Sequence, residues 1–480
     1  MATAGQPRHR HPSTVAGAEH APNLRRGASS LAAARIIRYL FRVVVLLLVA
    51  RIGGPEILGA YALLVMITET AFLFSGGGFG DFLAREVARD PRVGRSLGWQ
   101  LTKLRFAYLV IGVASTVSLL LLLRYPESLW TAGLLLGCAL FPRAAIESCQ
   151  GILRGTEHFA PIARTEAIMG TVLVATAFGL IEAGYGLRGI VLGELAAALA
   201  GMLDAVRAAA RHAPAGPKHL SVDRKLMSAT FAFNLYPLIV SVYDRVDVLL
   251  LSKLAGNIAV GIYSIPYRAY SALQILPYAL FGVWFPNFSR EWNSASQRRC
   301  SEIMTLLYAF ALFAILAVTF FATPTVAWAL GGRYAGSALA IKILIWATLP
   351  MFLNFALNAV LLATNHERIF IWTAIVCTVT NGALNLIFIP RYSFVAAAVA
   401  TVATEFVLLA QNAYLVRRKT GSLPFPAHSL PLTLMFAGAL SLAWMAGKVF
   451  PFYVTGTLAA ASFSLYVWWL YRRQGVRLAF

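Results

Sequence analysis

The sequence predicts an all-α polytopic membrane protein of about fourteen transmembrane helices, in which two six-helix lobes surround a central cavity and two further helices follow. The first observation is composition: 59% of the 480 residues are hydrophobic and 13% are charged, whereas soluble domains average about 25% charged residues. The second is that many apolar runs exceed the roughly 18–20 residues that a helix needs to cross a bilayer. The third is an internal repeat. Because lipid cannot satisfy backbone polar groups, each run must cross as a helix or as part of a closed barrel. Runs of this length favour helices, since barrel strands alternate over roughly 10 residues.

Fourteen apolar spans are separated by polar segments or by segments marked with Gly and Pro, such as RYPES, EAGYGLR and IPRYS. The predicted spans cover residues 31–50, 57–79, 101–123, 128–149, 161–182, 187–206, 227–252, 258–285, 303–330, 336–363, 369–389, 394–416, 429–447 and 452–471. Residues 1–30 contain arginines and no apolar signal-like stretch, so they are expected to form a flexible cytoplasmic tail.

Basic residues gather in alternate segments between the spans, which predicts that both chain ends are cytoplasmic. Each predicted outer segment has a single basic residue, namely Arg51, Arg124, Arg188, Lys253, Arg333, Arg391 or Lys448. The segment around the start of the third span has the most, and Arg105 is counted with it. The net charge of +21 therefore indicates basic loops at the cytoplasmic leaflet, not nucleic-acid binding. The four cysteines form no CxxC pair, so neither disulfides nor a metal site are predicted.

Two segments in the first half of the chain recur in the second. GGPEILGAY (Gly53–Tyr61) matches AGNIAVGIY (Ala255–Tyr263), with both glycines and the tyrosine at identical spacing. A weaker match relates LRGTEH (Leu153–His158) to LATNHE (Leu362–Glu367). Because six spans separate the copies, the halves are predicted to be parallel repeats about an axis along the membrane normal. Two such lobes around one cavity are typical of transporters that work by alternating access.

The predicted organisation follows from the spans and the repeat. It consists of a basic tail (1–30), an N-lobe (31–206), a cytoplasmic inter-lobe linker (207–226), a C-lobe (227–416), a cytoplasmic loop (417–428), a C-terminal helix pair (429–471) and a cytoplasmic tail (472–480).

Several motifs resemble those of bacterial polysaccharide flippases, the exporters of O-antigen and exopolysaccharide repeat units within the multidrug/oligosaccharidyl-lipid/polysaccharide exporter superfamily. They include RIGGPEILGAYALL, FGDFLAREVARD, DRVDVLLLSKLAGNIAVGIYSIPYRAY, LGGRYAGSALAIKIL and NGALNLIFIPRYSFVAAAVATVATE, and the resemblance covers residues 28–420. It departs from the family at Ser393, where the family usually has Gly. The resemblance implies a multi-pass protein of the bacterial inner membrane that moves undecaprenyl-pyrophosphate-linked oligosaccharide to the outer leaflet. The implied partners are this anionic lipid, the bilayer and the polysaccharide polymerase machinery.

Arginines within the spans are the candidate substrate-binding residues. Arg35, Arg38 and Arg42 are three and four residues apart and share one helical face. Charged residues facing lipid are costly, so this face is expected to line a wet cavity. For Arg35 and Arg38, extension of the side chains to the inner membrane surface is an equal alternative.

Arg268, about ten residues into the eighth span, is the strongest single candidate, and Arg143 and Arg245 are further candidates after the three arginines of the first span. A pyrophosphate must cross a medium of low dielectric constant. Arginine suits that task because its planar fork binds phosphate oxygens and keeps its charge. For Arg245, an ion pair with Asp244 or Asp247 is as well supported as ligand contact.

Asp244 and Asp247 share a helical face and are candidates for Na⁺ or H⁺ coupling, although neutralisation of Arg245 is the better-supported role. The sequence contains no ATP-binding Gly-rich loop and no nucleophile–base motif, and no cofactor is predicted. Alternatives to the oligosaccharide flippase are a cation-coupled drug exporter, a lipid II flippase and a membrane polymerase or ligase for lipid-linked sugars. The last class typically has a large outer loop, and every outer loop predicted here is short.

Overall fold

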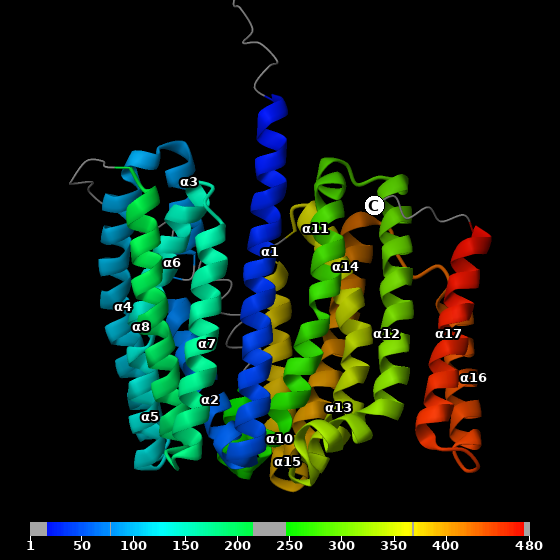
Figure 1. The fold of residues 1–480 in the computed structure, drawn as a ribbon. Coiled ribbons are helices and arrows are strands. Elements are labelled where there is room, and N and C mark those ends of the chain that lie inside the picture. Colours follow the sequence, from blue (N-terminus) through cyan, green and yellow to red (C-terminus); the bar gives the residue numbers. More distant parts are fainter. Residues whose placement is uncertain (1–16, 77, 215–245, 367–368, 475–480) are drawn as a thin grey trace, which may run out of the picture. The chain divides into compact units, whose positions relative to one another are not determined.

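The computed structural model describes residues 17–76, 78–214, 246–366 and 369–474, which fold into helices and connecting turns (Figure 1). The chain divides into two compact units. Unit 1 consists of Met1–Val45, Ala71–Ala183 and Arg188–Asn234, and unit 2 of Leu46–Thr70, Gly184–Leu187 and Leu235–Phe480. The division between the units passes through α1 (Gly17–Leu48) and α2 (Gly54–Phe74), so each of these helices contributes to both units.

Within the described residues, nine helices are long and apolar enough to cross a membrane, which makes this chain a multi-pass membrane protein. One of them, Ile369–Thr420, is broken at Ser393 and covers two of the predicted spans. Helices α1, α2 and α17 (Phe452–Gln474) overlap predicted spans but are not among the nine. Most of the predicted span 227–252 lies outside the described residues. The all-helical membrane fold is confirmed, while the count of fourteen and the cytoplasmic ends stay predictions.

Two helices begin earlier than the sequence predicted. Helix α1 begins at Gly17, inside the segment 1–30 that was expected to be a flexible tail. Its alanine-rich stretch before Arg35 favours helix, and a helix already nucleated in the apolar span extends readily into such residues. Helix α4 (Gly94–Leu122) begins before residue 101 because Leu97 packs, with Leu101, into a core with the helix before it.

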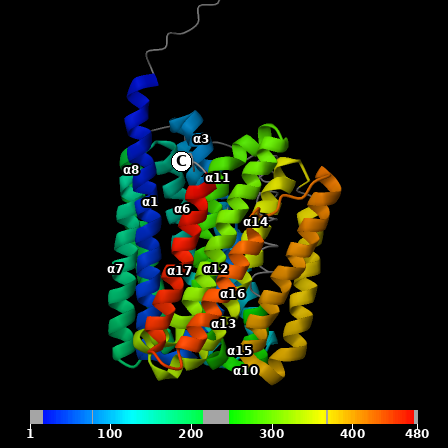
Figure 2. The ribbon, with the colours of Figure 1, turned by 90° about the vertical axis from the view of Figure 1, so that its right-hand side faces the viewer.

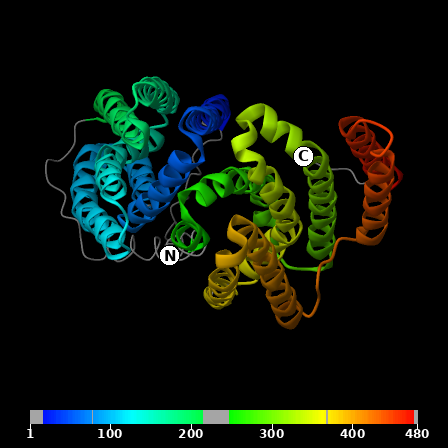
Figure 3. The ribbon, with the colours of Figure 1, turned by 90° about the horizontal axis from the view of Figure 1, so that it is seen from below.

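Unit 1 also contains α3 (Phe79–Arg89), η2 (Pro91–Val93), α5 (Glu127–Cys138), α6 (Leu140–Gly155), α7 (Ala160–Glu182) and α8 (Gly186–His212). Figure 3 shows these helices end-on, in blue to green. Helix α3 is amphipathic and buries Phe79, Leu83 and Val87. Glycines on α6 bring α3 close, since a Cβ on Gly151 would lie 2.7 Å from the main-chain oxygen of Gly80. This contact places the start of α3 beside the polar face of α6.

The other elements belong to unit 2. They are η1 (Val49–Gly53), α10 (Val246–Leu273), α11 (Ile275–Arg290), α12 (Ser294–Leu330), η3 (Gly332–Tyr334), α13 (Ala335–Leu344), η4 (Ile345–Ala347), α14 (Thr348–Ala363), α15 (Ile369–Thr420), α16 (Ser429–Ala446) and α17. Their common core is apolar, and its large buried side chains include Tyr263 from α10 and Phe352 from α14.

The C-terminal helices α16 and α17 lie side by side and pack on α12 (Figure 2). Phe320 of α12, Phe436 of α16 and Phe463 of α17 share one buried cluster. Gly456 admits the ring of Phe320, because a Cβ there would lie 2.6 Å from the Phe320 Cβ. The helix pair predicted as an appendage is therefore attached to unit 2 through a core of its own.

The two copies of the glycine–tyrosine segment have the same backbone conformation. Gly54 has φ 76° and ψ 179°, and its counterpart Gly256 has φ 84° and ψ 172°. These backbone angles favour glycine, because the Cβ of any other residue would clash with the backbone. Gly54 begins α2 and Gly256 marks a kink within α10, and each is followed by a buried tyrosine, Tyr61 or Tyr263. The structure thus supports the repeat predicted from the sequence.

The second sequence match is also real, but its alignment was shifted by one residue. Thr156 corresponds to Thr364, and the residues that follow them, Glu157 and Asn365, both have positive φ (60° and 59°). The next residue in each copy is a histidine, whose Nδ1 lies 3.2 Å and 3.1 Å from the threonine hydroxyl in the two copies. The sequence had instead paired Leu153 with Leu362. The adjacent leucine, Leu361, made that register ambiguous in sequence alone.

Candidate anion-binding site

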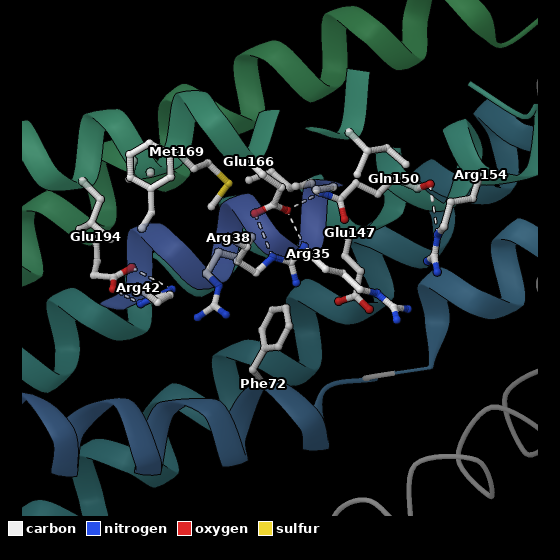
Figure 4. Close-up of a pocket in the computed structure, with 18 of the residues that line it drawn as sticks. Arg35, Arg38, Arg42, Phe72, Glu147, Gln150, Arg154, Glu166, Met169 and Glu194 are labelled. Carbon is white, nitrogen blue, oxygen red and sulfur yellow. Dashed lines mark hydrogen bonds and ion pairs between the residues drawn. The ribbon is translucent and has the colours of Figure 1, made fainter. Parts of the chain in front are cut away.

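A cavity lined by many charged side chains lies within unit 1 and has a volume of about 370 Å³ (Figure 4). It is lined by α1, the end of α2, the start of α3, and by α6, α7 and α8. Ten polar side chains line it: Arg35, Arg38, Arg42, Asp81, Arg143, Glu147, Gln150, Arg154, Glu166 and Glu194. The sequence predicted four of these, Arg35, Arg38, Arg42 and Arg143, as substrate-binding residues.

Arg38 forms a two-pronged ion pair with Glu166 of α7. Its Nε and Nη2 atoms donate to the two carboxylate oxygens, at 2.9 and 2.5 Å. Gln150 of α6 donates a third hydrogen bond to the same carboxylate, at 3.0 Å. The side chain of Glu166 is 6% exposed, whereas that of Arg38 is 55% exposed. The cationic member of the pair is therefore the more accessible one.

Arg42, one turn further along α1, pairs with Glu194 of α8. Its Nη1 lies 2.5 Å from Oε1, and Nη2 donates to Oε2 at 3.5 Å. The exposed fractions are 29% for Arg42 and 6% for Glu194. The i, i+4 spacing on α1 thus delivers two guanidinium groups to carboxylates on two different helices.

Arg35 and Arg143 also line the cavity. Arg35 is exposed, and no hydrogen bond or ion pair joins it to another residue in the described part of the chain. The guanidinium of Arg143 lies 5.1 Å from the ring centroid of Phe72. Arg35 is thus available to a ligand, and Phe72 steadies Arg143 through a cation–π contact.

A further arginine, Arg105 of α4, does not line the cavity but contacts two residues of its lining, Glu147 and Phe72. Its side chain has no solvent exposure, its Nη1 donates to Glu147 Oε2 at 2.6 Å, and its guanidinium stacks 4.1 Å from the Phe72 centroid. Its Nη2 has no hydrogen-bond partner among the described residues. The sequence placed Arg105 with the cytoplasmic segment, whereas the early start of α4 puts it in mid-helix.

At the other end of the cavity, Arg154 of α6 pairs with Asp81 of α3, at 2.5 Å. Arg154 was assigned to a cytoplasmic loop by sequence, because the predicted span ended at residue 149. Helix α6 continues to Gly155 and carries Arg154 on the face that also presents Glu147 and Gln150. The spacing of three and four residues among them was the signal that sequence reasoning missed.

Arg268, the strongest sequence candidate, lies in unit 2 on α10 and does not line this cavity. It is half-buried, and no hydrogen bond or ion pair connects it with another described residue. Its neighbours Tyr267 and Tyr270 continue an aromatic row that starts at Tyr263. Its role in substrate binding stays a prediction.

Asp247 is buried at the start of α10, and the Tyr263 hydroxyl donates to its Oδ2 at 2.9 Å. The same hydroxyl lies 3.1 Å from the Thr401 hydroxyl of α15. Asp244 and Arg245, the other predicted members of this group, lie outside the described residues. In α15, before its break at Ser393, Asn385 Nδ2 donates to Asn381 Oδ1 at 2.7 Å. Asn381 Nδ2 in turn donates to the hydroxyl of Thr404, beyond the break, at 3.3 Å.

The arrangement in unit 1 can hold an anion. Of the described residues, five arginines and four carboxylates line the cavity. The accessible members of its two α1 pairs are arginines, which offer several N–H donors to phosphate oxygens. The described residues contain no group of three or more His, Cys, Asp or Glu side chains placed to hold a metal ion. The four cysteines are free thiols.

Solved structures similar to this fold are membrane transporters. The lipid II flippase MurJ in an inward closed conformation superposes with a TM-score of 0.70 at 13% identity, over 92% of this chain and 99% of that chain. An outward-facing multidrug resistance MATE family transporter of the MOP superfamily gives 0.56 at 14% identity, over 83% and 95%. A MOP superfamily transporter from Pyrococcus furiosus gives 0.51 at 13% identity, over 83% and 95%. At these identities the likeness shows a common fold.

No individually curated protein matches this chain in sequence. A family model does match: the model described as polysaccharide biosynthesis protein covers residues 24–292, more than half of the chain. The matched region includes all the helices that line the arginine cavity. Together with the shared transporter fold, this match shows that the chain belongs to the polysaccharide biosynthesis protein family.

Proposed function

We propose that this protein is a flippase that moves an undecaprenyl-pyrophosphate-linked oligosaccharide from the inner to the outer leaflet of the bacterial inner membrane. The observation that carries the proposal is the row Arg35, Arg38 and Arg42 on one face of α1, which lines a cavity in a membrane-spanning unit. A diphosphate cannot enter the bilayer core without cations to offset its charge. This row supplies them on a single helix, and Arg143 and Arg154 add two from α6.

The volume of about 370 Å³ lies near the lower end of ligand pockets, which range from about 300 to 1,000 Å³. The cavity therefore suits the phosphates and an adjoining sugar, while the prenyl chain stays in lipid. The protein makes and breaks no covalent bond in this role. In the cell it would deliver repeat units of O-antigen or exopolysaccharide to a polymerase on the outer face.

Alternating access of the two lobes is the proposed mechanism, and Asp247 is the proposed site of Na⁺ or H⁺ coupling. Asp247 is buried and is hydrogen-bonded to Tyr263, which also contacts α15. A change in its charge would therefore alter the contacts between α10 and α15. Asp247→Asn should make transport insensitive to an imposed gradient of the coupling ion while leaving downhill exchange intact. A normal response to the gradient in this variant would show that Asp247 is not the coupling site.

A lipid II flippase is the second candidate, favoured by the similarity to MurJ over nearly the full length of both chains. Lipid II also carries a diphosphate, so the same arginines would serve. The two functions differ in the glycan that is accepted. Residues outside the arginine cavity would select that glycan.

Transport by purified protein in liposomes tests the proposal. Undecaprenyl diphosphate carrying a fluorescent oligosaccharide is placed in both leaflets, and a membrane-impermeant quencher reports movement between them. The wild-type protein should speed this movement, and Arg38→Gln/Arg42→Gln should abolish it. Equal movement of an uncharged prenyl glycoside, or export of a cationic dye in place of the lipid, would contradict the proposal. Movement of lipid II alone would favour the second candidate.

A further inference from the structure

Two carboxylates already occupy the arginines that the proposed substrate needs. Glu166 takes two donors of Arg38, and Glu194 takes one close donor of Arg42. All four side chains line the same cavity. Because the glutamates are 6% exposed and the arginines 55% and 29% exposed, an anion entering the cavity meets the guanidinium groups first.

Apolar contacts hold α1 in unit 1 in addition to these ion pairs. The ring of Phe41 lies directly on Gly170 of α7, where a Cβ would come within 2.1 Å of the ring. Nearer the start of α1, Ala34 is buried in a cluster with Leu153, Ile162 and Ala208. Apolar contacts thus attach α1 at two points. Buried ion pairs generally add little net stability, because desolvation offsets their attraction.

The Arg105–Glu147 pair provides a contrast within the same cavity. There the arginine is the fully buried partner and the carboxylate is 25% exposed. An anion cannot approach that guanidinium without displacing Glu147 and Phe72. The order of burial is reversed at Arg38 and Arg42, where the cation faces the cavity. This difference singles out Glu166 and Glu194.

We propose that Glu166 and Glu194 are internal counter-ions that compete with the anionic head group for Arg38 and Arg42, and thereby set how readily the head group is released. The inference rests on the proposed function and adds to it a determinant of turnover. Without these two glutamates, the positive charge of Arg38 and Arg42 would act on a bound diphosphate in full and slow its release. The two glutamates weaken the attraction and take back their arginines when the substrate leaves.

Each glutamate is surrounded by cationic and polar groups with which an entering anion would also interact. Glu166 contacts Arg38 of α1 and Gln150 of α6, and Arg35 and Arg154 line the same cavity. Glu194 contacts Arg42 of α1, and Arg143 and Glu147 of α6 line the cavity as well. Arg38 and Gln150 donate to Glu166, and Arg42 donates to Glu194. Glutamine in their place keeps an acceptor for the arginine and removes the negative charge.

Binding of inorganic pyrophosphate to the purified full-length protein, measured by titration calorimetry, tests the competition. Glu166→Gln and Glu194→Gln should each lower the Kd for pyrophosphate by about tenfold, as expected for removing one nearby negative charge. Glu166→Asp, which keeps the charge, should leave the Kd near that of the wild type. The matched control is Asp204→Asn, which removes the 2.8 Å Arg164–Asp204 ion pair. This pair joins α7 and α8, the helices that carry the two glutamates, and it lies outside the cavity. Its Kd should not change.

The same variants are then assayed for transport. Tighter binding with slower release predicts that KM and kcat both fall in Glu166→Gln and Glu194→Gln. An unchanged or higher Kd in the folded glutamine variants, or no pyrophosphate binding by any form, would overturn the competition. If one variant does not fold, the other decides the question by itself.

Failure of the competition is distinguishable from failure of the proposed function, because the binding assay uses neither lipid nor glycan. Tighter pyrophosphate binding without any transport of the lipid-linked oligosaccharide would support the counter-ion role of Glu166 and Glu194 and contradict the proposed substrate. Normal transport with unchanged Kd values would support the proposed substrate and contradict the counter-ion role.

Discussion

Gly59 of α2 and Gly261 of α10 make reciprocal backbone contacts. A Cβ on Gly59 would lie 1.8 Å from the main-chain oxygen of Asn257, and a Cβ on Gly261 would lie 1.9 Å from that of Pro55. Pro55 and Asn257 are themselves equivalent positions in the sequence repeat. The repeated segment therefore packs against its own copy about a local two-fold relationship, and the glycines make the close approach possible.

Gly59→Ala and Gly261→Ala should each destabilise the protein by about 3 kcal/mol, because the added methyl group meets a carbonyl oxygen that belongs to another helix. Thermal unfolding of the detergent-solubilised protein measures the effect. Gly382→Ala in α15 is the control, since a Cβ there meets nothing within 4 Å. It should be neutral or stabilising by up to about 1 kcal/mol. A wild-type melting temperature in both test variants would contradict the contact.

Ser393 adopts φ 51° and ψ −134° at the break in α15, a conformation that costs a residue with a Cβ about 1–3 kcal/mol. Ser393→Gly should therefore raise the melting temperature, and Ser393→Ala should not. The resemblance to the flippase family implies glycine at this position, a residue that adopts such angles without this strain. A lower melting temperature for the glycine variant would show that the serine side chain stabilises the break.

Arg42 lines the cavity and pairs with Glu194, and a double substitution separates its proposed binding role from a structural one. Arg42→Gln leaves Glu194 buried without this cation and should cost about 2 kcal/mol, less than for a fully buried pair because Arg42 is 29% exposed. Arg42→Gln/Glu194→Gln should recover most of the stability but not the transport, which should stay at least about tenfold below wild type. Recovery of transport in the double variant would show that Arg42 acts through structure alone. Arg164→Gln, at a half-exposed pair outside the cavity, should cost at most about 1 kcal/mol.

Arg105 should not tolerate lysine. Lysine keeps the charge but loses the planar stack on Phe72 and the fork that reaches both Glu147 and Ser75. Arg105→Lys is expected to lower stability by about 2 kcal/mol and to weaken pyrophosphate binding, because Glu147 and Phe72 lose their support. Lys103→Ala on the exposed side of the same helix should change neither quantity. If Arg105→Lys matches wild type in both assays, Arg105 does not support the cavity.

Sequence patterns predicted the membrane fold, the repeat and the α1 arginines, because each depends on local spacing. The i, i+3 and i, i+7 positions of Arg35, Arg38 and Arg42 define one face whatever the tertiary structure. The partners of that face were not predictable in the same way. Glu166 and Glu194 are distant in sequence from α1, and only the packing of α7 and α8 brings them to it.

Helix ends limited the remaining predictions. Arg105 and Arg154 were placed in cytoplasmic segments because hydropathy marks only the apolar part of a helix. Polar turns that continue α4 and α6 beyond that part leave no hydropathy signal. Yet Arg154 lines the cavity, and Arg105 contacts Glu147 and Phe72 of its lining. The one-residue error in the second repeat has a similar origin, since adjacent leucines, Leu361 and Leu362, fit the match equally well.

Direct binding of the proposed substrate tests the central claim, that the α1 arginines hold the phosphates of a lipid-linked sugar. Purified protein in lipid nanodiscs is titrated with labelled undecaprenyl diphosphate N-acetylglucosamine and, separately, with undecaprenol. The diphosphate lipid should bind to wild type, and Arg35→Gln/Arg38→Gln/Arg42→Gln should weaken it by at least about a hundredfold. Weak binding of undecaprenol should be the same in both proteins. Equal affinity of wild type and the triple variant for the diphosphate lipid would contradict the assignment of the cavity.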